Sequence, residues 1–241
     1  MVLSQLTPTR ILTVYVAQGI ILFVFLYLAL RILLRDRKRL NVFFAGLYIS
    51  PPIGILMNFI YAPLTDETIV LVLNFIANAT AIYAPIFIVV FDLILLKSEK
   101  IISTTKQLVI LIGYGIAVLC AAIFHFTPSY GVTINASTNW SPVWSLPIFI
   151  YVYAILTCFA TIPAAYFSIK IYKKFEDEVL KKKWRFFIFG FIALMTFMYL
   201  IFLSNTLDNP TFRTLLGIVG LILALLGGLS MYYGVGRQIQ K

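Results

Sequence analysis

The stretch ILTVYVAQGIILFVFLYLALRILL, residues 11–34, decides the fold class of this chain. It holds one charged residue, Arg31, in 24 positions, and a helix needs about 20 apolar residues to cross the hydrocarbon core of a bilayer. The basic cluster RDRKR follows at residues 35–39. Because the block is too long for the core of a signal peptide, we expect a retained membrane-spanning helix.

Six more apolar blocks follow the first one along the chain. The predicted spans cover residues 11–34, 42–62, 69–96, 108–126, 146–172, 186–203 and 215–235. Hydrophobic residues make up 61% of the 241 residues and charged residues only 12%, which is too little polar surface for a water-soluble domain. Transmembrane strands would alternate apolar and polar residues, and these blocks do not. We therefore predict an all-α membrane protein, a seven-transmembrane helix bundle forming a single domain over residues 1–241.

The positive charges predict the orientation of this bundle. All Lys and Arg residues except Arg10 and Arg213 fall on one side, in or beside the first, third and fifth connections and the C-terminal tail. Cytoplasmic loops carry such an excess, so we expect the N-terminus outside, the C-terminus in the cytoplasm, and a multi-pass protein of the plasma membrane. The net charge of +10 then indicates contact with anionic lipid of the bilayer and no nucleic-acid partner.

Several chemistries lack the residues they need. The chain has one histidine, His125, and two cysteines, so a metal site with three or four His, Cys or carboxylate ligands is not expected. No serine lies in a nucleophile-elbow motif, no Gly-rich phosphate loop is present, and the last two spans contain no lysine for retinal. We expect neither a cofactor nor enzymatic activity.

Polar side chains inside the spans are the candidates for a binding site. Four amides fall at similar depth in the predicted outer half, and an amide facing lipid would leave its donors and acceptors unpaired. They either line a polar pocket that opens outward or tie helices together, as amides often do in membrane bundles. The candidate pocket residues are Gln18, Asn58, Asn74 and Asn78, joined by His125, Tyr151, Tyr199 and Asn205.

Asp92 is the one carboxylate inside a predicted span, near its cytoplasmic end. An intramembrane carboxylate is a functional candidate by default. Inner-leaflet cations such as Arg31 or Arg35 could pair with it, so we favour a structural or switch-like ion pair over an ion-transport site.

Two further patterns concern helix shape and packing. Pro51 and Pro52 remove backbone donors in mid-span, which predicts a kink. Gly220, Ala224 and Gly228 lie four residues apart on one face of the last span, so they allow close helix approach within the bundle or across a homodimer.

The longest outer connection, about residues 127–145, leads into STNWSPVWSLP at residues 137–147. Trp140 and Trp144 fall where outer headgroups are expected, so an aromatic belt is the favoured interpretation. The preceding YGVTINAST could form a small hairpin that caps the bundle, so a lid over a binding site stays open as the alternative.

The helix order also permits a small-solute transporter. RLNVFFAGLYI at 39–49 and KKWRFFIFGFI at 182–192 share a basic start, two phenylalanines and a following glycine. Such a match suits two three-helix repeats joined by the fourth helix, the 3+1+3 type. Basic-then-aromatic sequence is also what any helix leaving the cytoplasmic surface tends to have.

Three stretches carry a resemblance to a known family. They are LLRDRKRLNVFFAGL at 33–47, NWSPVWSLPIFIYVYA at 139–154 and EDEVLKKKWRFFIFG at 176–190. The layout, over nearly the whole chain, resembles the N-terminal seven-transmembrane sensory region of prokaryotic membrane histidine kinases. That resemblance implies a sensor. The chain departs from the pattern after the last span, where no kinase follows, so output is expected to pass to a separate cytoplasmic partner or a C-terminal part that was removed.

Together these observations predict a receptor-like membrane sensor. A small molecule or lipid would bind in the outer-half cavity, and the signal would leave through the charged inner connection at residues 173–185, predicted as a helical extension. The 3+1+3 transporter is the alternative.

Overall fold

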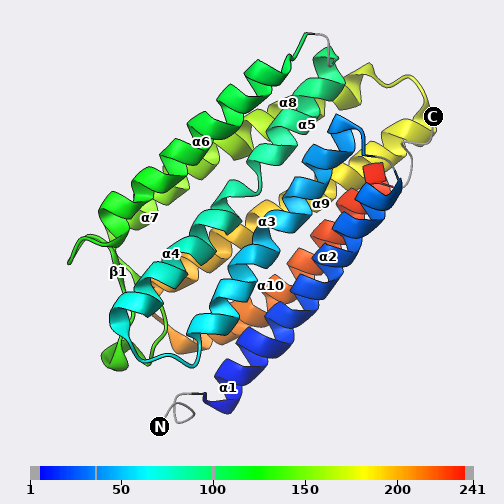
Figure 1. Cartoon of the computed structure of the whole chain (residues 1–241). Coiled ribbons are helices and arrows are strands. Elements are labelled where there is room, and N and C mark those ends of the chain that lie inside the picture. The colour runs from blue at the N-terminus through cyan, green and yellow to red at the C-terminus, as the bar shows by residue number, and fades with distance from the viewer. Residues whose placement is uncertain (1–5, 36, 99–100, 237–241) are drawn as a thin grey trace.

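The computed structural model describes residues 6–35, 37–98 and 101–236. Within these ranges, seven helical segments are long and apolar enough to cross a membrane, and they pack lengthwise into an elongated bundle (Figure 1). This confirms the predicted all-α, multi-pass membrane architecture. The surface agrees with it, because Ile112, Ile116, Leu119 and Ile123 form a stripe on one span with 57–69% of each residue exposed. A water-soluble protein rarely leaves such a continuous apolar stripe uncovered.

Each span is built from one to three helical elements. The first contains α1 (Pro8–Arg10), η1 (Ile11–Ala17) and α2 (Gln18–Arg35); the second is α3 (Arg39–Tyr61); the third contains α4 (Glu67–Tyr83) and α5 (Ile86–Lys97); the fourth is α6 (Thr104–His125). The fifth contains α7 (Leu146–Ile155), η3 (Leu156–Thr161) and α8 (Ile162–Lys174); the sixth is α9 (Glu178–Leu207); the seventh contains α10 (Pro210–Met231) and η4 (Tyr232–Gly236). Between α6 and α7 lie β1 (Val132–Thr133), η2 (Ala136–Thr138) and β2 (Val143–Trp144).

The sixth span begins earlier than predicted. Helix α9 starts at Glu178 and not at residue 186, because the Asp177 carboxylate caps it by accepting from the Val179 N–H at 2.7 Å. The segment 173–185 is therefore the end of α8, a turn at 175–177 and the first turns of α9. The predicted helical extension is two helix ends that meet at a turn.

One span is interrupted, and this occurs at Pro85, which is separate from the kink predicted at Pro51 and Pro52. Helix α3 runs through both Pro51 and Pro52, whereas the third span is broken between Tyr83 and Ile86. Pro85 precedes the first residue of α5 and has no N–H to continue the ladder of α4.

The seventh span packs inside the bundle along its small residues. A Cβ on Gly220 would lie 2.6 Å from the ring of Phe197, and one on Gly228 would lie 2.9 Å from that of Phe25. Ala224, between them, is completely buried. The face predicted for a possible homodimer through helix 7 is thus occupied by α9 and α2 of the same chain, so it is not available to a second copy.

The bundle has two chemically different ends (Figure 1). At one end lie α1, the α3–α4 connection, the strands β1 and β2, and the α9–α10 turn; we call it the hairpin end. At the other end lie the α2–α3, α5–α6 and α8–α9 connections together with η4. We call this the basic end, because the lysine- and arginine-rich sequences border these elements.

The core near the basic end is aromatic and closely packed. Phe44, Phe91 and Phe187 are all buried and contact one another with ring centroids 5.1–6.1 Å apart. Trp184 stacks on Phe187 at 4.5 Å, and its indole N–H donates to the Ser168 carbonyl at 2.8 Å. This end therefore combines apolar packing with a satisfied polar group.

Candidate ligand-binding site

A small β-hairpin covers one end of the bundle. Val132 pairs with Trp144 and Thr133 with Val143 in an antiparallel ladder. The loop between the strands is fixed by Asn135, whose side chain accepts from the N–H groups of Ser137 and Thr138. The Ser145 N–H also donates to the Gly131 carbonyl at 3.0 Å. A hairpin does form at this end, but only its first strand lies in the stretch 130–138 where one was considered; the second strand is Val143–Trp144.

The two hairpin tryptophans have different surroundings. Trp144 is only 2% exposed, and its ring stacks on Phe202 of α9 with centroids 5.0 Å apart and an interplanar angle of 20°. It points into the protein, so the belt interpretation is wrong for Trp144. Trp140 is partly exposed, and its role as a headgroup anchor stays a prediction.

A half-open cavity of about 280 Å³ lies between this hairpin and the end of α6. Its wall combines the end of α6, the following loop, both strands and one residue of α4. The lining residues are Leu71, His125, Phe126, Thr127, Pro128, Ser129, Gly131, Val132, Thr133, Val143, Trp144 and Ser145. Its volume is close to the lower end of the range for small-molecule sites, about 300–1,000 Å³.

Two polar atoms of the cavity wall are buried without a hydrogen-bond partner among the described residues. They are the indole Nε1 of Trp144 and the hydroxyl Oγ of Ser145, which are consecutive in sequence. Leaving a buried donor unpaired costs about 1–3 kcal/mol, so proteins keep few of them. Because the two atoms have almost no accessible surface, Trp144 and Ser145 line the cavity through other atoms.

His125 closes the inner side of the cavity. Its Nε2 donates to the Leu71 carbonyl at 3.1 Å, because a carbonyl can only accept, and its ring contacts Phe75 and Phe126. A separate, very small crevice of about 10 Å³ lies between α4, α6 and α7, and its lining includes His125, Trp144 and Asn78. His125 and Trp144 therefore stand between the cavity and this crevice.

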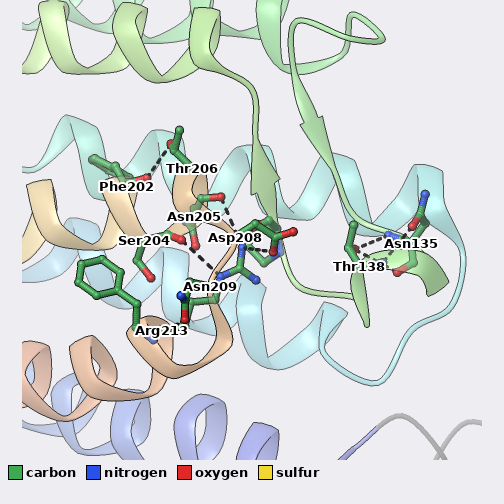
Figure 2. Close-up of polar contacts among 11 residues, drawn as sticks. Asn135, Thr138, Phe202, Ser204, Asn205, Thr206, Asp208, Asn209 and Arg213 are labelled. Atoms are coloured by element: carbon green, nitrogen blue, oxygen red, sulfur yellow. Dashed lines mark hydrogen bonds and ion pairs between the residues drawn. The ribbon is translucent and has the colours of Figure 1, made fainter.

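Arg213 attaches the hairpin to the turn between α9 and α10. Its Nη2 donates to the Pro142 carbonyl of the hairpin loop at 2.7 Å. The same guanidinium contacts the Ser204 and Asn205 carbonyls at 3.4 Å and the Asp208 carboxylate at 3.3 Å. Figure 2 shows Arg213 reaching from the start of α10 toward the end of α9, beside the hairpin loop. A displacement of the hairpin must therefore disturb this turn.

Arg10, the other cation at this end, also reaches the hairpin. Its Nη1 donates to the Asn139 carbonyl at 3.4 Å. Burial lowers the pKa of the Arg10 guanidinium from its ordinary value, and the nearby Tyr61 and Tyr15 hydroxyls oppose that shift. Both cations at the hairpin end thus bind carbonyls of the cap.

The four predicted pocket amides are mostly used within the fold. Asn58 donates to the Gln18 side chain at 3.1 Å, which ties α3 to α2. Asn74 is buried and donates to the Tyr61 hydroxyl at 3.0 Å, while Asn78 donates back to Asn74 at 2.9 Å. The amides form two separate groups that link helices, and only Asn78 reaches the crevice below the cavity.

The remaining predicted pocket residues are also dispersed. Tyr151 donates to the Ala117 carbonyl at 2.7 Å and joins α7 to α6. The Tyr199 hydroxyl bonds Thr157 and Thr161 at 2.8 and 2.9 Å, which links α9 to the π-helical segment η3. Asn205 lies at the α9–α10 turn, where its carbonyl accepts from Arg213. Of the eight candidates, His125 alone lines the main cavity.

The predicted partner of Asp92 is not the observed one. Asp92 is completely buried, and its Oδ2 accepts from the Ser168 hydroxyl of α8 at 2.5 Å. No ion pair to Arg31 or Arg35 is formed within the described residues; Arg31 is exposed and lies over the Tyr27 ring at 5.8 Å. The reason is geometric, because the third and fifth spans pack together here and bring a hydroxyl to the carboxylate.

The described residues contain no group of three or more His, Cys, Asp or Glu side chains that could hold a metal ion. In comparisons with known proteins, the chain matches no family model and no curated protein. The fold therefore defines a multi-pass membrane protein with seven candidate spans, and the hairpin end holds the candidate functional site.

Sequence reasoning missed Trp144 and Ser145 as site residues. The sequence pattern favours a membrane-surface position for Trp144 and allows a lid only for the preceding residues. One local signal was available: Ser145 precedes Leu146 and Pro147 at a helix start, where a serine is expected to cap. Its hydroxyl makes no such bond, and this can be seen only in three dimensions.

Proposed function

We propose that this protein is a seven-helix membrane sensor that binds a small molecule in the cavity beneath the hairpin. The single observation that carries this function is an approximately 280 Å³ pocket formed by the hairpin and the end of α6, in which the lining residue Trp144 also stacks on Phe202 of α9. A ligand held in the pocket would therefore contact a residue that packs against a membrane-spanning helix.

A path from the cavity to the basic end supports a sensor. Trp144 stacks on Phe202, and α9 continues from there to its first residue, Glu178. Arg213 connects the hairpin loop to the other end of the same helix. A ligand that moves Trp144 would therefore act on α9 directly. It can shift a conformational equilibrium only if it binds the two arrangements differently.

The charged segment 173–185 is the proposed output. It contains the ends of α8 and α9, where a cytoplasmic partner would find Lys173, Lys174 and the Lys181–Glu178 pair. This sidedness, with the N-terminus outside and the protein in the plasma membrane, rests on the distribution of lysine and arginine. The resemblance to the sensory region of histidine kinases supports the same assignment.

Transport of a small solute is the less favoured function. A transporter of the 3+1+3 type places its site near mid-membrane between the repeats. The cavity of this protein lies instead at one end, covered by a hairpin that belongs to neither repeat.

The sensor function is tested by filling the cavity. In lipid nanodiscs, Thr133→Phe enlarges an exposed residue of the cavity wall, whereas Ser141→Phe changes the hairpin loop outside that wall. We expect Thr133→Phe alone to change amide hydrogen exchange across residues 173–185. Unchanged exchange in both variants, with the fold intact by circular dichroism, would contradict a sensor that signals from this cavity.

A further inference from the structure

We propose that Asp92 is a proton-binding site at a junction of three spans. As a neutral carboxylic acid bonded to Ser168 it holds the third, fifth and sixth spans together, and release of its proton to water loosens them. The site lies near the basic end and is separate from the cavity at the hairpin end. It follows from the contacts, the burial and the charges of the described residues around one carboxyl group.

The three spans meet at Ser168. Its hydroxyl donates to Oδ2 of Asp92, so α8 of the fifth span is bonded to α5 of the third. Its backbone carbonyl accepts from the indole N–H of Trp184 at 2.8 Å, which adds α9 of the sixth span. Asp92 and Ser168 are completely buried, and Trp184 is nearly so. A change at the carboxyl therefore reaches α9 through a single residue.

Asp92 has no counter-charge among the described residues, with which it forms no ion pair. The elements that pack closely against α5 are α3, α6, α8 and η3. The charged side chains on these elements and on α5 itself are all exposed: Arg39, Lys106, Lys170, Lys173, Lys174 and Lys97. The positive charges of α9 lie in its first two turns, where Lys181 bonds Glu178 and Arg185 bonds the Tyr172 hydroxyl.

The buried titratable groups on the neighbouring helices are also engaged elsewhere. Tyr48 of α3 donates to the Gly228 carbonyl of α10 at 2.8 Å. Tyr114 of α6 donates to the Ile82 carbonyl at 3.0 Å, and His125 of α6 lies at the hairpin end. Within the described chain, the Ser168 hydroxyl is thus the single side-chain group bonded to Asp92.

The second oxygen of the carboxyl decides between its two protonation states. Oδ1 of Asp92 is buried and has no hydrogen-bond partner among the described residues. If Oδ1 carries the proton, one neutral hydroxyl is left unpaired, and this cost is small beside that of burying an ion with a single donor. The neutral acid therefore has the lower free energy, with Ser168 donating to its carbonyl oxygen, Oδ2.

Release of the proton changes the packing of the three spans. A carboxylate at this position can be stabilised only by water, so Asp92 must become accessible and its contact with Ser168 must open. Because the closed junction holds one proton more than the open one, its stability falls as the pH rises. Trp184 belongs to the first turns of α9, so this opening reaches residues 173–185.

Infrared spectroscopy of the full chain in lipid nanodiscs tests the proton directly. A protonated carboxyl absorbs at higher frequency than the amide bands, a carboxylate does not, and exposed carboxyls are ionised at neutral pH. We expect one carboxylic-acid band at neutral pH that Asp92→Asn removes. Asp208→Asn, which changes an exposed carboxylate, is the control and should leave the band unchanged. Ser168→Ala should move the band to higher frequency, because the carbonyl oxygen loses its donor.

A pH titration tests the junction. Asp92→Asn is the matched reference, because its amide keeps a donor and an acceptor in the same shape but cannot ionise. As the pH is raised to about 10, we expect the band to fade. Amide hydrogen exchange across residues 173–185, relative to Asp92→Asn at the same pH, should then rise by about tenfold per pH unit beyond the point at which half of the band is lost.

Three results would overturn the proposal. Absence of a carboxylic-acid band at neutral pH would show that Asp92 is ionised. A band that stays unchanged up to about pH 10 would show that the proton is not released. A rise in exchange that Asp92→Asn shares would separate the opening from the carboxyl. The frequency shift in Ser168→Ala assigns the band to Asp92 even if Asp92→Asn folds poorly.

Discussion

Trp184 near the basic end and Trp144 at the hairpin end look alike in most respects. They are 3% and 2% exposed, and each stacks on a phenylalanine, with centroids 4.5 and 5.0 Å apart and interplanar angles of 22° and 20°. They differ in the hydrogen bonding of one atom, the indole Nε1. The Nε1 of Trp184 donates to the Ser168 carbonyl, whereas that of Trp144, a residue that lines the cavity, has no partner among the described residues.

This difference separates a packing role from a binding role. Burial and stacking supply the apolar stabilisation of both rings, so neither property distinguishes them. The unpaired donor does distinguish them, because its cost is about 1–3 kcal/mol and nothing in the fold of the hairpin end offsets it. Four pairs of substitutions, ordered by expected effect, test this contrast between the two ends.

The largest effect is expected from Gly131→Ala, which attacks the hairpin end alone. A Cβ at Gly131 would lie 2.3 Å from the carbonyl oxygens of both Phe124 and His125, so the hairpin must move away from α6. We expect a loss of about 3 kcal/mol, at the upper end for overpacking, together with loss of the cavity. Gly113→Ala is the control, since a Cβ there meets nothing within 4 Å and should stabilise the helix slightly. Equal unfolding midpoints for the two variants would contradict the tight seating of the hairpin.

The second test exchanges each tryptophan for phenylalanine. Trp184→Phe keeps an aromatic ring but removes the donor to Ser168, which should cost about 2 kcal/mol in unfolding free energy. Trp144→Phe removes an unpaired donor and should be close to neutral in the absence of ligand. Denaturant titration in mixed micelles measures both. A larger loss for Trp144→Phe would mean that its indole N–H is satisfied in the ligand-free protein.

The third test weakens the attachment of the hairpin. Arg213→Met removes the donor to the Pro142 carbonyl and should cost about 1.5 kcal/mol, the lower value for a hydrogen bond to a charged group. The Asp208 partner is 57% exposed, so its ion pair should add little. Arg10→Met, which loses one longer contact at 3.4 Å, should cost less. If hydrogen exchange in the hairpin rises no more in the first variant than in the second, Arg213 does not hold the cap.

The smallest effect concerns two helix starts. Asn209 caps α10 by accepting from the Phe212 N–H at 3.0 Å, so Asn209→Ala should cost about 1 kcal/mol. Ser145 occupies the same position on α7 but makes no capping bond, so Ser145→Ala should change stability by less than about 0.5 kcal/mol. Thermal unfolding distinguishes the two. A full capping loss at Ser145 would assign its hydroxyl to the fold and not to a ligand.

The sequence predicted the spans well because span formation depends on local composition. A run such as residues 11–34 has no alternative outside a bilayer, and helix α2 together with η1 covers it closely. A hairpin in this connection was predicted only in part, because its second strand, Val143–Trp144, lies beyond the stretch 130–138. The start of α9 was not predicted correctly. Asp177 caps the helix within a charged stretch, and the residues on both sides of Asp177 have a helical pattern.

Pairing between distant residues was beyond the sequence. The partner of Asp92 is Ser168 in another span, and cations of the right charge closer in sequence gave a plausible but wrong ion pair. The burial of Trp144 likewise depends on Phe202 and cannot be read from a tryptophan between two prolines. The sequence positions of the four amides predicted a similar depth in the membrane. Which amides bond one another depends on helix packing, as when α2 packs on α3 and Asn58 donates to Gln18.

A high-resolution structure of the protein extracted from its native membrane with lipid present would probe the cavity most directly. Compact non-protein density in the cavity between the hairpin and the end of α6 is the result we expect. A hairpin lying flat on α6 with the cavity closed, or ordered water alone in the cavity, would contradict a ligand site at this end of the bundle.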